Sequence, residues 1–113
     1  MPKTNFVDYV VQDLLAGVRG VRARAMFGGH GLYKEDQIFG IIVDDQLFFK
    51  VGDANRKDYE AAGSQPFTYQ VRNRKKRTSM SYWEVPASVM DDREALAEWM
   101  ERSVAVARRI RRS

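Results

Sequence analysis

The stretch IFGIIVDDQLFFKV, residues 38–51, contains two short apolar segments separated by the polar residues Asp44, Asp45 and Gln46. Parallel strands need a crossover of a dozen or more residues, so strands joined by three residues can pair only in the antiparallel sense. The stretch therefore predicts a hairpin of strands 38–43 and 47–51, with an antiparallel sheet at the centre of the fold.

Both faces of this predicted hairpin are apolar. Side chains alternate between the two faces of a strand, so one face should carry Ile38, Ile42, Leu47 and Phe49. The other set is Phe39, Ile41, Val43 and Phe48. Helices that cover one face leave the other in water, so we interpret the second set as a candidate surface for a protein partner or a second copy of the chain. A helix crossing that face is the alternative.

The residues before the hairpin predict a helix, a strand and a sharp bend. Residues 5–18 place apolar side chains at spacings of three and four, with Thr4 as N-cap and Gly17 or Gly20 as the stop. VRARAMF, residues 21–27, then alternates as a strand with one wet face.

The next segment, MFGGHGLY, residues 26–33, has three glycines around the single histidine. No lysine follows at the spacing of a phosphate loop, and a strand rather than a helix comes next. The glycines are therefore predicted to bend the chain between strands.

The residues after the hairpin predict a helix, two strands and a last helix. The helix that follows the hairpin should be capped by Asp53 and end at Gly63. FTYQV (67–71) and MSYWEV (80–85) follow as strands, joined by a basic connection. Asp91 and Glu94 resemble a capping box that opens the final helix.

The predicted architecture is one α+β domain spanning residues 1–113, with a basic tail at about 108–113. It has two layers: an antiparallel sheet of about five strands, and helices packed on one face.

The composition excludes several classes of site. The chain has 113 residues, of which 44% are hydrophobic and 30% charged, with no cysteine and one histidine. Disulfides, thiolate sites and multi-histidine metal clusters are therefore excluded, and we expect neither a metal nor a cofactor. No segment predicts a signal peptide or a membrane span, so we expect a cytoplasmic protein.

The net charge of +4 is unevenly distributed. Nine of the nineteen basic residues fall in two runs, which predict a candidate surface for nucleic acid. A solvated loop and tail explain the runs equally well. The runs comprise Arg72, Arg74, Lys75, Lys76 and Arg77, and then Arg108, Arg109, Arg111 and Arg112.

Catalysis has little support in the sequence. His30 titrates near neutrality and is the one candidate for a general base. It is accompanied by no nucleophile motif, so we predict no enzymatic activity and no catalytic residue, and keep an enzyme centred on His30 as a remote alternative.

Several motifs together resemble the N-terminal domain of the TfoX/Sxy competence regulators. They are the glycine stretch, KVGDAN (50–55) and SYWEVP (81–86), and the resemblance covers nearly the whole chain. It implies the order α-β-β-β-α-β-β-α, similar to secretion chaperones. It offers no catalytic set, and its motif residues look like fold determinants: Met26, Phe27, Gly28, Gly29, Gly31, Tyr33, Tyr82, Trp83 and Pro86.

The resemblance also implies a role in transcription of DNA-uptake genes, beside a factor such as the cyclic-AMP receptor protein. We therefore predict a non-enzymatic interaction domain that acts through protein contacts, with a homodimer as one possible assembly. The alternative from another class is a largely non-specific nucleic-acid binder that uses the two basic runs.

Overall fold

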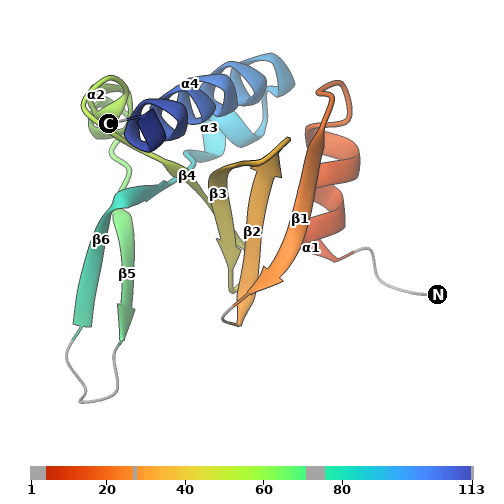
Figure 1. Cartoon of the computed structure of the whole chain (residues 1–113). Helices are drawn as coiled ribbons and strands as arrows, with labels where there is room; N and C mark the ends of the chain where they lie inside the picture. The colour runs from red at the N-terminus through yellow and green to blue at the C-terminus, as the bar shows by residue number, and fades with distance from the viewer. Residues whose placement is uncertain (1–4, 27, 71–75, 113) are drawn as a thin grey trace.

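The computed structural model describes residues 5–26, 28–70 and 76–112. It contains one antiparallel sheet with the strand order β1-β2-β3-β4-β6-β5 (Figure 1). This confirms the predicted α+β class, with six strands instead of about five and four strands instead of three before the middle helix. The strands are β1 Val21–Met26, β2 Gly29–Lys34, β3 Gln37–Val43, β4 Gln46–Lys50, β5 Pro66–Gln70 and β6 Lys76–Glu84.

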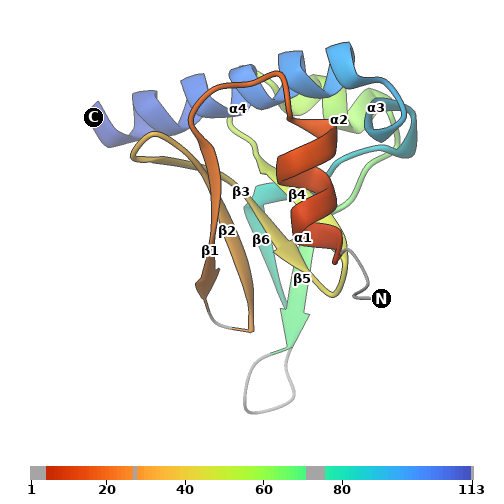
Figure 2. The same ribbon diagram turned by 90° about the vertical axis from the view of Figure 1, so that its right-hand side faces the viewer.

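The helices gather around one side and one end of the sheet. The elements are α1 Phe6–Asp8, which continues into the π-helix η1 Tyr9–Leu14, then α2 Arg56–Ala61, α3 Ala87–Met90 and α4 Arg93–Arg112. Figures 1 and 2 both show α4 lying across one end of the strands, whereas β5 points toward the opposite end. Among the described residues, no helix combines the length and apolar character needed to cross a membrane.

The helix caps differ from the predicted ones by a residue or two. Asn5 caps the first helix by accepting a hydrogen bond from the Asp8 N–H, and Thr4 lies outside the described residues. Asp92, not Asp91, caps α4, because its carboxylate accepts from the N–H groups of Glu94 and Ala95. Neighbouring polar residues compete for a cap, and tertiary packing decides which of them turns toward the helix end.

The core lies between α4 and the sheet. On α4 the side chains of Leu96, Met100 and Val104 recur at helical spacing and are at most 1% exposed. They belong to the same apolar cluster as Phe39 and Phe49, whose rings meet edge to face at 5.6 Å. Burial of this helix face against β3 and β4 joins the two layers.

A bulge in β3 corrects the predicted assignment of faces. Leu32 pairs with Gly40 and Tyr33 with Ile38, so Phe39 is an extra residue between the two pairs. The bulge turns Phe39 into the core, where its side chain is 0% exposed. Strict alternation across residues 38–43 was therefore the wrong assumption for Phe39.

The glycine stretch forms the bend that its composition predicts. Met26 pairs with Gly29, which closes a hairpin between β1 and β2, and Gly28 has φ +79°. A Cβ on Gly29 would lie 2.5 Å from the carbonyl oxygen of Ile42. Gly28 supplies the positive φ that other residues avoid, and Gly29 allows the backbone of β3 to approach closely.

A buried polar node links β4, α2 and α4. The Lys50 carbonyl accepts hydrogen bonds from Asn55 Nδ2 at 3.1 Å and Ser103 Oγ at 2.8 Å. The Asn55 side-chain oxygen accepts from the Gly52 N–H at 2.8 Å. Asn55 and Ser103 are at most 2% exposed, so these bonds satisfy groups that water does not reach. The motif KVGDAN is therefore a structural turn, with Asn55 rather than Asp53 as the residue that holds it.

We expect Gly29→Ala to lower the free energy of unfolding by about 1–3 kcal/mol, because the new methyl group meets backbone that must shift. The matched control is Gly17→Ala, since nothing lies within 4 Å of the Cβ position at Gly17. Urea unfolding of both variants measures the difference. Equal midpoints for the two variants would contradict the close-approach explanation.

We expect Asn55→Ala to cost about 1–3 kcal/mol, because it leaves the buried N–H of Gly52 without a partner. Asp53→Ala in the same turn should change stability by less than about 0.5 kcal/mol, because the Asp53 carboxylate is solvent-exposed. Chemical denaturation compares the two. A larger loss for Asp53→Ala would show that Asp53 holds the turn instead.

Candidate functional site

The sheet face opposite the core, here called the open face, contains the second predicted set of apolar residues. Ile41 pairs with Phe48, and Phe48 pairs with Glu84, so these three side chains share the open face across β3, β4 and β6. Phe67 from β5 packs edge to face on Phe48, with ring centroids 4.8 Å apart. The exposed fraction of Phe48 falls to 6% because β5 folds over it.

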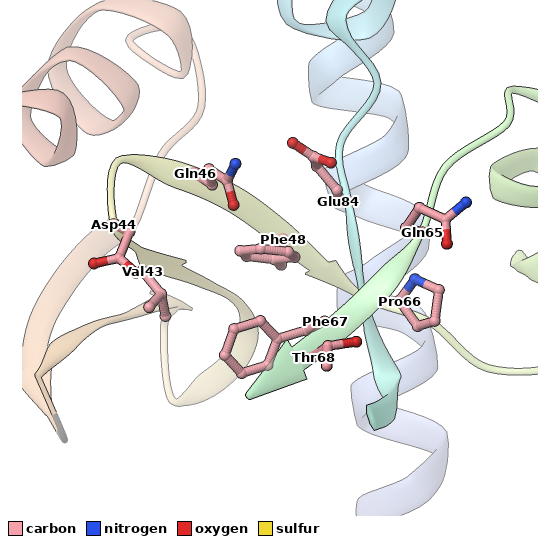
Figure 3. A pocket seen from close by; sticks show the side chains of 9 residues that line it. All are labelled: Val43, Asp44, Gln46, Phe48, Gln65, Pro66, Phe67, Thr68 and Glu84. Atoms are coloured by element: carbon pink, nitrogen blue, oxygen red, sulfur yellow. The ribbon is translucent and has the colours of Figure 1, made fainter. Parts of the chain in front are cut away.

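One part of the open face is a hollow between the β3–β4 turn and β5 (Figure 3). Its volume is about 300 Å³. Figure 3 shows the Phe48 and Phe67 rings together, between Asp44 and Gln46 on one side and Gln65 on the other. The lining residues are Val43, Asp44, Gln46, Phe48, Gln65, Pro66, Phe67, Thr68 and Glu84. The hollow therefore combines an apolar floor with two carboxylates and two amides.

A second part of the open face is an aromatic–cation cluster of Arg22, Tyr33, Lys50 and Tyr82. Lys50 Nζ lies 4.9 Å from the centroid of the Tyr82 ring, and the Arg22 guanidinium lies 5.7 Å from that of Tyr33. Burial raises the pKa of Tyr82, and the nearby Tyr33 phenol raises it further. The same partial burial lowers the pKa of Lys50. The two tyrosines share the open face, on strands that β3 and β4 separate.

The structure keeps three of the four residues of the predicted partner surface on the open face. Val43 and Ile41 are half-buried there, and Phe48 forms the floor of the hollow. Phe39 is removed from the set, because the bulge places it in the core. The same bulge pairs Ile38 with Tyr33, so Ile38, which was predicted on the core side with Ile42, lies on the open face instead.

The two basic runs are not brought together. Arg72, Arg74 and Lys75 lie outside the described residues, whereas Lys76 and Arg77 begin β6 by pairing with Gln70 and Tyr69. In Figures 1 and 2 the β5–β6 ends that the first run joins lie at the bottom, and the end of α4 lies at the top.

The second run belongs to the end of α4. Arg108 contacts the Glu35 carboxylate at 3.6 Å, and Arg109 is exposed. Arg111 and Arg112 form the last turn of the helix. Any anionic ligand that bridges the two runs would have to span the length of the sheet.

His30 lies in β2 opposite Ala25 and Ile42 and is half-buried. Its ring makes no hydrogen bond or ion pair with another described residue.

The motif residues beyond the glycines also have structural positions. Trp83 is 5% exposed and lies 6.4 Å from the ring of Tyr59 in the core, whereas Tyr82 faces the opposite side. Successive side chains of a strand point to opposite faces, so the two aromatics are separated by the sheet. Pro86 opens α3, and its carbonyl accepts from the N–H groups of Val89 and Met90. Phe27 lies outside the described residues.

Sequence reasoning missed the aromatic–cation cluster. Alternation from the buried Phe49 to Lys50 could have placed the lysine on the open face. Nothing local places Tyr33 on the same face as Tyr82, because that depends on the register of the strands between them.

Comparison with known proteins agrees with this architecture. No curated protein is similar enough in sequence to count as a match. The pattern of the TfoX N-terminal domain matches residues 13–107, which is most of the chain. This family is linked to competence regulation and is generally regarded as regulatory rather than catalytic. The matched region runs from η1 into α4 and includes all six strands, so the chain belongs to the TfoX N-terminal domain family.

Proposed function

We propose that this chain is a non-enzymatic regulatory domain that binds a protein partner through the hollow of the open face and thereby influences transcription. The hollow between the β3–β4 turn and β5 is the observation that carries the proposal. The family's link to competence regulation supports a regulatory outcome.

The chemistry of the hollow favours an amphipathic partner. Phe48 and Phe67 offer an apolar floor that a partner side chain of matching size can cover. Asp44 and Glu84 place carboxylates at the same hollow, so a cation beside that apolar side chain would be matched in charge. A transcription factor such as the cyclic-AMP receptor protein is the candidate partner by resemblance, and a second copy of the chain is the alternative occupant.

We expect Val43→Glu to abolish the regulatory effect, because it adds a third carboxylate to the apolar part of the hollow. Gln12→Glu is the control, since it adds the same side chain at an exposed position on η1. The measurement is transcript abundance of DNA-uptake genes in cells that lack the chain and are complemented with each variant. Binding of each purified variant to the purified cyclic-AMP receptor protein is measured in parallel.

If transcript levels in the Val43→Glu strain equal those of the wild type, and urea unfolding shows that the variant is folded, then the hollow is not the interaction site. Unchanged transcripts on deletion of the chain itself would overturn the regulatory role.

We expect His30→Ala to leave the transcript levels within about twofold of the wild type, because the proposed mechanism is burial of surface and not proton transfer. Stability of the variant is measured alongside. Loss of the regulatory effect in a variant that remains fully folded would favour an activity centred on His30.

A further inference from the structure

The Lys50 side chain lies on the open face beside the ring of Tyr82. Its side chain is half-buried on the open face, where burial lowers the pKa of the ammonium group. Lys50 forms no ion pair with any described residue. Its ammonium group lies 4.9 Å from the centroid of the Tyr82 ring. A partly desolvated cation without a counter-ion is a typical feature of a site that receives an anion.

The surroundings of Lys50 add aromatic surface and further positive charge. The strand pairings place Tyr33 and Tyr82 on the same face of the sheet, and Arg22 lies over the Tyr33 ring. Arg24 follows Arg22 on the same face of β1 and is exposed, with no ion pair to a described residue. Arg22 donates a hydrogen bond to the Glu35 carbonyl at 3.3 Å and lies 3.7 Å from the exposed Asp36 carboxylate, so its partners are at the surface. Three cations and two phenol rings therefore lie on the same face of the sheet.

We propose that this aromatic–cation cluster binds a short stretch of single-stranded nucleic acid. Bases stack on Tyr33 and Tyr82, and the phosphates between them contact Lys50, Arg22 and Arg24. Aromatic side chains accept any base as a stacking partner, and a groove of positive charge follows the backbone, so such a site tolerates many sequences. The site adjoins the hollow, because Lys50 and Tyr82 are the next pair on the same face after Phe48 and Glu84. It uses other side chains and does not rest on the proposed function.

Two features favour a single strand over other anionic ligands. In a duplex the base faces are already stacked, so Tyr33 and Tyr82 could contribute little to its binding. An acidic peptide would use the three cations but would leave both rings without a stacking partner. The combination of rings and cations is therefore used fully by an unpaired nucleotide chain.

The test is fluorescence anisotropy of a labelled twelve-nucleotide oligo-dT, titrated with the full chain at several salt concentrations. We expect the logarithm of affinity to fall with log salt at a slope of about −2, because three phosphate contacts each contribute about −0.7 for a single strand. Tyr82→Leu should weaken binding roughly tenfold, whereas Tyr82→Phe should retain binding, because it keeps the ring.

Lys50→Gln should weaken binding and reduce the magnitude of the salt slope by about 0.7. Two controls remove the same chemical groups away from the open face. Lys57→Gln removes an exposed cation of α2, and Tyr9→Leu removes a phenol that is 41% exposed on η1. Both controls should bind the oligonucleotide within about twofold of the wild type.

Four outcomes would overturn the proposal. The first two are absence of binding at low salt and a duplex bound as tightly as the single strand. The third is an equal loss of affinity in Tyr82→Leu and Tyr82→Phe, and the fourth is an equal loss of affinity in Lys50→Gln and Lys57→Gln. Binding to oligo-glutamate in place of oligo-dT would assign the cluster to an acidic protein.

A basic-run control separates the cluster from the neighbouring connection. If replacing Arg72, Arg74, Lys75, Lys76 and Arg77 by serine abolishes binding while Tyr82→Leu and Lys50→Gln bind normally, the connection and not the cluster is the site. The titration contains no protein partner, so its failure leaves the transcription experiment above unaffected.

Discussion

The burial of one side of α4 against β3 and β4 is the interaction on which the rest of the structure depends. Leu96, Met100 and Val104 form an apolar stripe that the sheet removes from water. Ser103, on the same side of the helix, donates to the carbonyl of Lys50. That carbonyl also receives the Asn55 amide, so one backbone group connects the last helix, the turn before α2 and the end of β4. Apolar packing supplies most of the stabilisation, and the buried hydrogen bonds determine how the elements are aligned.

This arrangement explains why the two faces of the sheet differ. The face toward α4 is closed and apolar, and the bulge adds Phe39 to it. The open face is divided between a hollow with carboxylates and a cluster with cations. The Lys50 backbone is held in the core while its side chain emerges among aromatic rings on the other face. A substitution that disturbs the buried node therefore also displaces the open face. For this reason, the stability of each variant that tests the function of the open face must be measured as well.

The glycine stretch shows how a motif that resembles a functional loop can be explained by backbone geometry. Gly28 adopts a positive φ, and Gly29 lies where a methyl group would meet the carbonyl of Ile42. His30 is then one residue of a strand, with Ala25 and Ile42 as its neighbours. The functional interest of this region lies further along β2, at Tyr33.

The sequence by itself determined the elements whose signals are local. Two apolar segments joined by three polar residues could only form an antiparallel hairpin, and the polar residues around Asp91 marked the start of the final helix to within a residue. The turn at Gly28 and the opposite orientations of Tyr82 and Trp83 follow from the same short-range rules. The motifs also carried the family resemblance, which the domain match confirmed.

Only the tertiary structure decided which residues of the open face meet. Phe39 leaves that face because β3 must stay in register with β2 on both sides of an extra residue. Phe67 covers Phe48 because β5, distant in sequence, folds over β4. Tyr33 and Tyr82 share one face because the register of four paired strands places them there. Each outcome depends on pairing between segments far apart in the chain, and the periodicity of a single segment contains no information about its distant neighbours.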